Sequence, residues 1–276
     1  MVKAMKKIFT DSISDILSTL KENKPLIHCI TNPISINQCA NTVLAVSARP
    51  VMAEHPLEVE EITSTASALM LNLGNISDVR MESMKLAAGT ASLRAIPIVF
   101  DAVGVACSSL RRAYTLDFLK KTAPTVIKGN YSEILALTDS KYLSEGVDAD
   151  KNLEFAAALN AAVALSEGSG SIVLASGKTD IVTDGKSVII IKNGSPMLSS
   201  ITGTGCMLGA LTACFLSGTS ADNSLTAAAL ACAYLGICGE LAETEKGSGS
   251  FSLNLFDRLS SSDMDVIKER LDMEVI

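Results

Sequence analysis

The residues with the clearest chemical potential form the sequence Thr-Gly-Thr-Gly-Cys at 202–206. A β-like run at 187–192 precedes it, and a run that is apolar on all sides, 207–216, follows it and stops at Gly218. Such a run is typical of a buried helix, and glycine commonly follows a helix end. The pattern therefore predicts that the two glycines of this sequence lie at the N-terminus of a core helix.

That position suits a negatively charged group. The first N–H groups of a helix have no partner within the helix, and the helix dipole adds positive potential there. Gly203, Thr204 and Gly205 would let an anion approach the backbone closely, which predicts a phosphate or oxyanion site with the thiol of Cys206 at its rim. These residue types are also ordinary at helix starts and in cores, so this sequence alone leaves both interpretations open.

Further polar residues lie where predicted strands end. Short apolar runs alternate with helical patterns and lie at 25–30, 50–53, 68–73, 97–100, 124–127 and 171–175. This alternation predicts an α/β fold with a mostly parallel central sheet and helices on both faces. Ligands gather at the carboxyl ends of such strands. Besides the glycine sequence, the polar residues expected there are Asn32, Asp101, Lys128, Asn130, Glu133 and Ser176.

Other patterns complete the expected fold. A helical pattern over 13–20 is expected to begin at Thr10 or Asp11, and Asp78 is expected to cap another helix. An Asp-Gly pair within 180–191 predicts a β-hairpin, which we expect towards the edge of the sheet. Because the pattern shows no internal repeat and no linker, we expect a single domain over residues 1–276.

Composition excludes several classes of function. The 276 residues are 48% hydrophobic and carry a net charge of −7 without a basic cluster, which argues against a nucleic-acid partner or an anionic membrane. The Ala-rich run at 225–238 is too short and too weakly apolar to span a bilayer, so a buried helix explains it better.

Cysteine usage indicates the compartment. The seven cysteines form no C-x-x-C pair, and only two histidines accompany them, so a zinc site has little support. Reduced thiols in the cytoplasm are the simplest explanation, and no apolar leader follows the basic N-terminus.

The polar residues match the needs of phosphoryl transfer. That reaction requires a carboxylate near Mg²⁺, donors for the moving charge, and a group that places the acceptor hydroxyl. Asp101 and Glu133 are candidate carboxylates, and Lys128 and the N–H groups of the Gly-Thr-Gly sequence are candidate donors. Each has a structural explanation as well: Asp101, Asn130 and Glu133 as helix-capping residues, and Lys128 as a surface charge.

The sequence resembles the hydroxyethylthiazole kinase family of the ribokinase-like superfamily, which acts in thiamin salvage. The resemblance covers nearly the whole chain and is carried by residues 28–32, 50–53, 72–74, 101–104, 128–134, 193–194 and 202–206. The Asn-x-x-Glu pair and the Gly-Thr-Gly sequence are features of the superfamily. Cysteine at 206, where the superfamily usually has aspartate, is typical of the thiazole kinases, as are Ile-Thr-Asn at 30–32 and Pro-Val-Met-Ala at 50–53.

The resemblance implies a ribokinase-like fold and an ATP:alcohol phosphotransferase. The implied substrate is the thiazole alcohol 4-methyl-5-(2-hydroxyethyl)thiazole. By the same resemblance, Asn32, Ile34, Met52 and Gly203 line its site, with Cys206 near its hydroxyl. We expect Cys206 to orient this hydroxyl and to accept its proton late, with a pKa that the helix N-terminus lowers.

The resemblance also implies the cofactors and the assembly. Lys128, Ser176 and Asn130 would contact ATP, whereas Asp101 and Glu133 would serve Mg²⁺ and its waters. The family is trimeric, which implies a cytoplasmic homotrimer with its sites at subunit interfaces.

The sequence departs from the family pattern at four positions. Ala102 and Ser248 stand where the family usually has proline, Lys128 stands in place of arginine, and Ser176 stands in place of threonine. Lysine keeps the charge but lacks the bidentate geometry of arginine towards phosphate, so nucleotide binding is expected to differ from that of the family.

Three rival functions fit parts of the same pattern. They are a related kinase for hydroxymethylpyrimidine or a small sugar, an ATP-dependent dehydratase of the same superfamily, and a non-catalytic binding protein. The apolar side chains of Ile34 and Met52 argue against a sugar, which needs many hydrogen-bond partners.

Overall fold

The computed structural model describes residues 2–139, 142 and 155–276. Its strands are β1 (Leu26–Ile30), β2 (Arg49–Val51), β3 (Ala68–Asn72), β4 (Ile98–Asp101), β5 (Val126–Asn130), β6 (Ile172–Ser176), β7 (Asp180–Thr183), β8 (Val188–Ile191) and β9 (Met273–Val275). The α-helices are α1 (Val2–Asn23), α2 (Ile36–Ala45), α3 (Val59–Thr65), α4 (Asp78–Leu93), α5 (Ser109–Lys121), α6 (Tyr131–Thr138), α7 (Phe155–Ser169), α8 (Thr204–Ser217), α9 (Ser224–Ala242), α10 (Ser248–Ser261) and α11 (Met264–Arg270). Two short 3₁₀ helices are η1 (Pro196–Ser200) and η2 (Ala221–Asn223).

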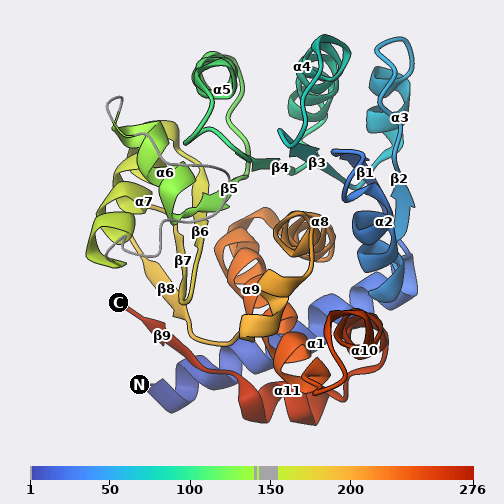
Figure 1. The fold of residues 1–276 in the computed structure, drawn as a ribbon, viewed down its shortest axis with the longest axis vertical. Helices are drawn as coiled ribbons and strands as arrows, with labels where there is room; N and C mark the ends of the chain where they lie inside the picture. The colour runs from blue at the N-terminus through green and yellow to red at the C-terminus, as the bar shows by residue number, and fades with distance from the viewer. Residues whose placement is uncertain (1, 140–141, 143–154) are drawn as a thin grey trace.

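These strands form one sheet of nine strands in the order β2-β1-β3-β4-β5-β6-β7-β8-β9 (Figure 1). From β2 to β6 all neighbours are parallel, whereas β6 to β9 pair antiparallel. The predicted mostly parallel α/β fold is therefore confirmed. The predicted hairpin is β7–β8, and it lies next to the edge because β9 adds one more strand outside it.

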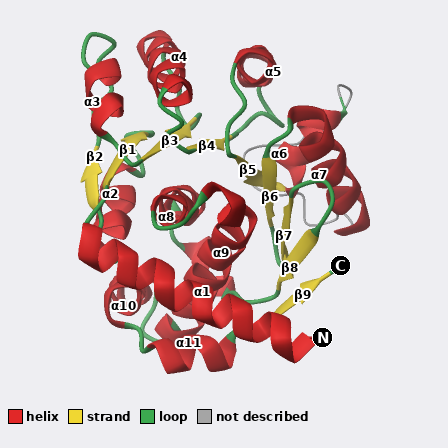
Figure 2. Cartoon of the chain, turned by 180° about the vertical axis from the view of Figure 1, so that it is seen from behind, coloured by secondary structure: helices red, strands yellow, loops and turns green. Residues whose placement is uncertain are grey.

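Helices cover both faces of the sheet. In β3, Ala68 and Met70 pack into the cluster that contains α8 and α9, whereas Leu69 and Leu71 pack into the cluster that contains α4 and α5. This alternation follows from the strand geometry, which points successive side chains to opposite faces. Figures 1 and 2 show the sheet curving around α8 and α9, with α3, α4, α5, α6 and α7 on its outer face.

The helix α8 is the buried core helix that the sequence predicts. Every residue from 207 to 216 is buried, and the helix ends at its C-cap, Gly218. It packs against α9. On α9, Gly236 allows a close approach of the chain that follows β8, since a β-carbon there would lie 2.6 Å from the carbonyl oxygen of Asn193. Among the described residues, the stretch Ala221–Ala242 has the length and apolarity of a membrane span, but 78% of its apolar window is buried, as in a core helix.

Two expected helix starts are wrong. The helix α1 begins at Val2 rather than at Thr10 or Asp11, because its buried stripe extends upstream through Phe9. The cap of α4 is Ser77 rather than Asp78: Ser77 is extended, and its Oγ accepts the N–H of Arg80 at 3.3 Å.

Candidate functional site

The carboxyl ends of the parallel strands bring the predicted polar residues side by side. In the strand register, Asn72 lies opposite Asp101, and Asp101 lies opposite Lys128. One strand further, Asn130 lies opposite Ser176. The sheet thus aligns side chains that are far apart in the sequence, as expected for the ligand-binding edge of such a fold.

A cavity of about 770 Å³ opens at this edge. The residues that line it come from the strand ends and from the segment that leads into α8: Asn32, Ile34, Ser35, Gly74, Asn75, Val103, Arg111, Lys128, Asn130, Glu133, Ser176 and residues 199–206. Two predicted site residues are not among them. Asp101 is fully buried beneath the cavity, and Met52 is half-buried and packs against the core cluster around α8.

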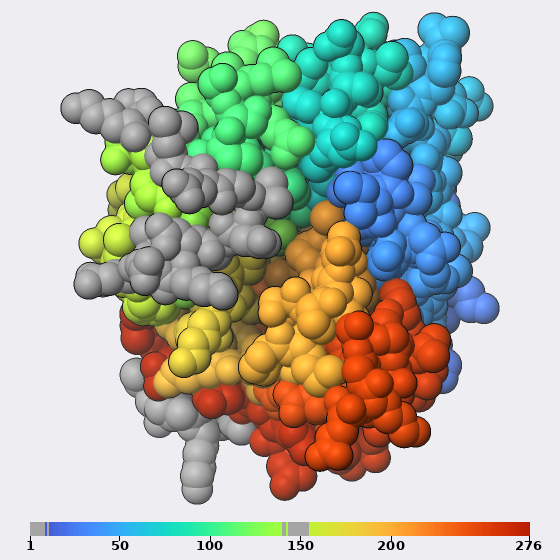
Figure 3. Space-filling model, in the orientation of Figure 1, coloured from blue at the N-terminus to red at the C-terminus, as the bar shows by residue number. Residues whose placement is uncertain are grey.

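The start of α8 reaches this cavity at the surface of the molecule. Gly203 caps the helix with a φ of 93°, in the left-handed region that favours glycine. A β-carbon at Gly203 would lie 3.0 Å from the β-carbon of Ser35, so this turn packs tightly against the segment before α2. Figure 3 shows the chain near residue 200 at the surface beside the blue segment that follows β1.

A buried ion pair lies directly under the helix start. Lys128 Nζ is 3.0 Å from Asp101 Oδ1, and their side chains are 5% and 0% exposed. A β-carbon at Gly205 would lie 3.3 Å from the same Nζ atom, so the ammonium group touches the first turn of α8. The ammonium group therefore lies beside the first turn of α8, where helix N–H groups have no partner within the helix, and this arrangement suits a polyanion.

Each charge of this pair favours the ionised form of the other. Burial disfavours the ammonium form of Lys128, but the carboxylates of Asp101 and Glu133 outweigh it, so the pKa of Lys128 is raised. Burial raises the pKa of Asp101, and Lys128 opposes that shift at hydrogen-bond distance. We assign an ionised pair, because Asp101 Oδ2 also accepts a hydrogen bond of 2.7 Å from Asn72.

Glu133 combines a capping role with a place in the cavity wall. Its Oε2 accepts the N–H of Asn130 at 2.7 Å, and its own N–H donates to Asn130 Oδ1 at 2.9 Å, which completes a capping box at the start of α6. Its Oε1 accepts the N–H of Gly104 at 2.7 Å. Burial raises the pKa of Glu133 to about 7, although Lys128 and these N–H groups favour the ionised form.

The thiol of Cys206 lies at the rim of the cavity, as predicted. Its Sγ accepts hydrogen bonds from the amide groups of Asn32 at 3.4 Å and Asn72 at 3.3 Å. Contrary to the expectation from a helix N-terminus, its pKa is raised, because burial and the negative charge of Asp101 outweigh the opposing effect of Lys128. The resting group is therefore a neutral thiol.

Two residues of this site have no role predicted from the sequence. Asn72 belongs to a family motif, and its place as the last residue of an apolar strand is the sequence feature that points to it. Arg111 lines the cavity from α5, and its Nη1 donates to the carbonyl oxygen of Val103 at 3.2 Å. An arginine within an ordinary helical pattern gave no indication of this position.

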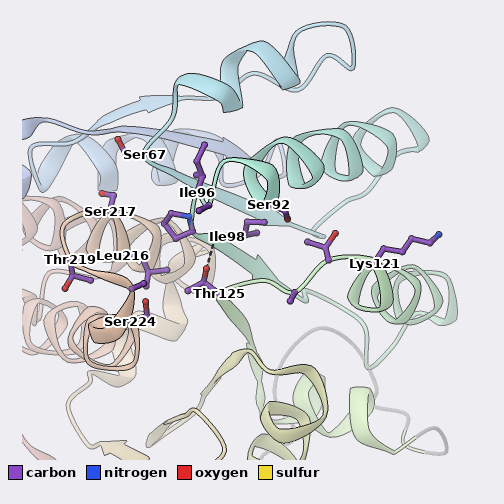
Figure 4. A pocket seen from close by; sticks show the side chains of 15 residues that line it. Ser67, Ser92, Ile96, Ile98, Lys121, Thr125, Leu216, Ser217, Thr219 and Ser224 are labelled. Carbon is purple, nitrogen blue, oxygen red and sulfur yellow. Dashed lines mark hydrogen bonds between the residues drawn. The ribbon is translucent and has the colours of Figure 1, made fainter.

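A second cavity, of about 540 Å³, lies at the opposite edge of the sheet. Its wall contains hydroxyl groups from the loops before β3 and β5 and from the junction of α8 and α9 (Figure 4). Thr125 Oγ1 accepts the N–H of Ile98 there at 3.1 Å, and Lys121 extends away from the other labelled side chains (Figure 4). Among the described residues, no carboxylate or thiol lines this cavity, so the groups that phosphoryl transfer requires are not found there.

Comparison with known proteins identifies the family. The model of the hydroxyethylthiazole kinase family matches residues 17–265. A hydroxyethylthiazole kinase of Clostridium botulinum (strain Hall) is 46% identical over 267 residues, which cover 93% of this chain and 97% of the relative.

Solved structures agree with the sequence comparison. The structure of a hydroxyethylthiazole kinase from Pyrococcus horikoshii OT3 matches with a TM-score of 0.86 and 31% identity, covering 98% of this chain and 99% of the other. A ribokinase-like superfamily protein from Enterococcus faecalis V583 matches with a TM-score of 0.59 at 13% identity, over 87% of this chain and 88% of the other, and shares the fold alone.

Proposed function

The chain belongs to the hydroxyethylthiazole kinase family, and from this premise we propose that it transfers the γ-phosphoryl group of ATP to the hydroxyl of 4-methyl-5-(2-hydroxyethyl)thiazole. The product would be the thiazole phosphate used in thiamin salvage. The observation that carries the proposal is the meeting of the α8 start with the buried Lys128 in one cavity. Backbone N–H groups and a cation that converge on one point can stabilise charge on a transferring phosphoryl group.

In the proposed reaction, the substrate oxygen forms a bond to the γ-phosphorus while the bond from that phosphorus to the β,γ-bridging oxygen breaks. The N–H groups of Thr204 and Gly205 and the ammonium group of Lys128 receive the charge that moves with the phosphoryl group. Because the thiol of Cys206 already carries a proton, we assign it the orientation of the hydroxyl and not the acceptance of its proton. That proton leaves with the product and passes to solvent.

The carboxylates suit a magnesium ion that is held through water. Among the described residues, no group of three or more His, Cys, Asp or Glu side chains is arranged to hold a metal directly. Both oxygens of Glu133 accept backbone N–H groups, and Asp101 is paired with Lys128. Mg²⁺ usually keeps several waters and binds one or two carboxylates together with substrate phosphates, which fits these partly engaged oxygens. When bound, the ion would neutralise charge on the phosphates.

The nucleotide contacts that we propose lie on the strand ends β5 and β6. Lys128, Asn130 and Ser176 line the cavity together, next to the start of α8. The hydroxyl of Ser176 donates to the carbonyl oxygen of Gly129 at 3.3 Å, so its oxygen is still able to accept a hydrogen bond. The ammonium group of Lys128 would contact phosphate as a single point charge, whereas the guanidinium group of an arginine would form two parallel hydrogen bonds to it.

The substrate side of the cavity has few unused polar atoms. The amide of Asn32 is engaged at both ends: Oδ1 accepts the N–H groups of Ile34 and Ser35, and Nδ2 donates to Asn72 and Cys206. Beside it, Ile34 is 62% exposed and apolar. Such a lining favours an apolar heterocycle over a sugar, whose hydroxyl groups would stay unpaired.

We also propose a cytoplasmic homotrimer in which a neighbouring subunit closes the open side of the substrate site. The support is the exposure of apolar side chains in the cavity wall, in α2 and in the segment before α3: Ile34 is 62% exposed, Leu44 55% and Leu57 90%. Covering these side chains would remove apolar surface from water. Light scattering coupled to gel filtration tests this, because a monomer of 28.9 kDa and a trimer differ threefold in mass.

The decisive experiment is an assay of ATP consumption with the thiazole alcohol, with and without Mg²⁺, followed by identification of the product. A phosphorylated thiazole that forms only with Mg²⁺ supports the proposal. Hydroxymethylpyrimidine and ribose in parallel reactions test the rival kinases, and hydrated NADH tests the dehydratase. Binding of the thiazole alcohol without any ATP consumption would instead indicate a non-catalytic protein.

A further inference from the structure

Asn72, the last residue of β3, is at the centre of the buried polar groups beneath the cavity. Its side chain is fully buried and makes hydrogen bonds in two directions. Through Oδ1 it accepts from Asn32 Nδ2 at 2.9 Å and from the N–H of Gly74 at 2.8 Å. Through Nδ2 it donates to Asp101 Oδ2 at 2.7 Å and to Cys206 Sγ at 3.3 Å. All the hydrogen-bonding capacity of this amide is used.

The orientation of this amide follows from its partners. The N–H of Gly74 can only donate, so the atom that faces it must be the oxygen of Asn72. The same reasoning fixes Asn32, because its Oδ1 faces the N–H groups of Ile34 and Ser35, both at 3.1 Å. Turning either amide around would place N–H against N–H. Both NH₂ groups therefore point at the sulfur.

This arrangement controls the direction of the Cys206 thiol. Two N–H donors occupy the side of Sγ that faces the protein, so the S–H bond cannot point towards them. The remaining directions lead to Ser35 and to the cavity that Cys206 lines. The sulfur is also fixed in place relative to Asp101, since one NH₂ group of Asn72 holds both of them.

We propose that Asn72 is a positioning residue for phosphoryl transfer, and that it acts by fixing the thiol of Cys206 against the carboxylate of Asp101. This inference rests on the proposed function, in which Cys206 orients the substrate hydroxyl. It adds a residue that touches neither ATP nor the thiazole alcohol. With Asn72 in place, the acceptor hydroxyl is held at a set distance from the groups that receive the transferred charge, which is the geometric requirement of a near-attack arrangement.

A double-mutant cycle tests this proposal. We expect Asn72→Ala to lower kcat about tenfold, because the thiol loses one of its two fixing hydrogen bonds, while KM for the thiazole alcohol stays within about twofold. In a Cys206→Ala background, the same Asn72→Ala change should lower kcat by less than about twofold, since there is no thiol left to position. Asn72→Ser, which keeps a small polar group, should give an intermediate loss in the first background and none in the second.

Asn193→Ala is the matched control for loss of a buried amide. Asn193 Nδ2 donates to Glu240 Oε1 and to the carbonyl oxygen of Arg270, and its Oδ1 accepts the N–H of Asp272, all outside the cavity. It should lower the unfolding temperature as Asn72→Ala does, but leave kcat unchanged below that temperature. If Asn72→Ala only destabilises the fold, the two variants will behave alike, and the proposal is overturned.

The remaining outcomes separate this inference from the proposed function. Equal losses of kcat from Asn72→Ala in both backgrounds would show that Asn72 does not act through Cys206. A shifted Mg²⁺ requirement in both backgrounds would instead show that it acts through Asp101, and would also overturn the inference. Wild-type protein that fails to phosphorylate the thiazole alcohol would overturn the proposed function itself, and the inference with it.

Discussion

Two lysine–aspartate pairs at opposite edges of the sheet have the same distance between nitrogen and oxygen but differ in their exposure to solvent. Lys128 and Asp101 at the carboxyl edge are 3.0 Å apart, and so are Lys121 and Asp117 near the amino edge. The side chain of Lys128 is 5% exposed, whereas that of Lys121 is 67% exposed. Water screens the second pair but not the first. The distance between two charges therefore does not identify a functional site, whereas the environment of the pair does.

The two cavities differ in the same way. The cavity at the carboxyl edge combines a buried cation, a buried carboxylate and a thiol with the start of a long core helix. The cavity at the amino edge is lined mainly by hydroxyl and apolar groups, and its lysine extends away from the others (Figure 4). Because charges interact strongly where water is excluded, the charged groups at the carboxyl edge should act more strongly on a bound anion than the exposed lysine at the amino edge.

Replacing each of the two lysines by alanine should give the largest difference in kcat and in stability between the two edges. Lys128→Ala should lower kcat by about 10²–10³-fold, because a preorganised donor to the moving charge is lost. It should also lower the free energy of unfolding by about 3–5 kcal/mol, since Asp101 is left buried without its partner. Lys121→Ala should change neither quantity measurably. Steady-state kinetics and urea unfolding measure both, and normal turnover by Lys128→Ala would break the comparison.

Replacing the thiol should have the next largest effect. Cys206→Ala should lower kcat about thirtyfold without abolishing it, because orientation of the hydroxyl is lost while charge stabilisation remains. Cys206→Asp should stay active within about tenfold, since a carboxylate can also orient a hydroxyl through a hydrogen bond. Cys107→Ala, which removes an exposed thiol outside the cavity, is the control. An unchanged kcat in Cys206→Ala would remove the residue from the mechanism.

The carboxylates provide a third test through the metal. Glu133→Gln and Asp101→Asn should each raise the Mg²⁺ concentration for half-maximal turnover about tenfold, because each removes a negative charge that holds the ion or its waters. Binding of the thiazole alcohol without nucleotide, measured by calorimetry, should change little. Should both variants saturate at the wild-type Mg²⁺ concentration, the role of Glu133 would reduce to capping α6.

Two glycines at opposite edges of the sheet allow the effect of backbone strain on stability to be separated from its effect on turnover. Gly203 at the carboxyl edge and Gly170 before β6 at the amino edge both have positive φ angles, of 93° and 70°. Alanine at either should cost about 1–2 kcal/mol of stability. Only Gly203→Ala should also reduce kcat, by about fivefold, because its β-carbon would push Ser35 at 3.0 Å, while nothing lies within 4 Å at Gly170. Thermal unfolding and turnover rates of the two variants measure this difference.

The smallest expected effect concerns a buried histidine between the two edges. His28 in β1 is fully buried; its Nε2 donates to the carbonyl oxygen of Ala53, and its Nδ1 accepts from Thr63. Burial lowers its pKa below 6.5. The unfolded chain therefore binds a proton more readily, so this residue favours folding above about pH 6.5 and loses that contribution as the pH falls towards its folded pKa. His28→Gln should flatten the fall in the free energy of unfolding as the pH drops below about 6.5.

The layered α/β fold and the core helix were predictable because both depend on local patterns. Short apolar runs indicate strands that are covered on both faces, and a continuous apolar run indicates a buried helix. The order of the strands was not predictable, since the chain places β2 outside β1 without any local feature that shows it. The strand β9 was not predicted because it is short: residues 273–275, Met-Glu-Val, pair with β8, and an alternation of three residues is too brief to indicate a strand.

The sequence could suggest candidate residues for the site, but it could not predict the contacts among them. The sequence indicated Lys128 and Asp101 separately, as a nucleotide contact and a metal ligand, and only the strand register makes them a buried pair. The pKa of Cys206 was expected to fall because of the helix start, yet it rises, because burial depends on packing that no motif describes. Asn72 was not assigned a role, since its importance lies in four partners from different parts of the chain.

The inward-facing amide of Asn32 has a consequence for selectivity. Every polar atom of the Asn32 side chain is hydrogen-bonded to the protein, so this side chain can recognise a bound ring only through its shape. A pocket that selects by outline discriminates poorly between isosteres, typically by about 10–200-fold for a single methylene. If the thiazole ring binds beside Asn32 as proposed, ring analogues of the same shape should therefore also be phosphorylated.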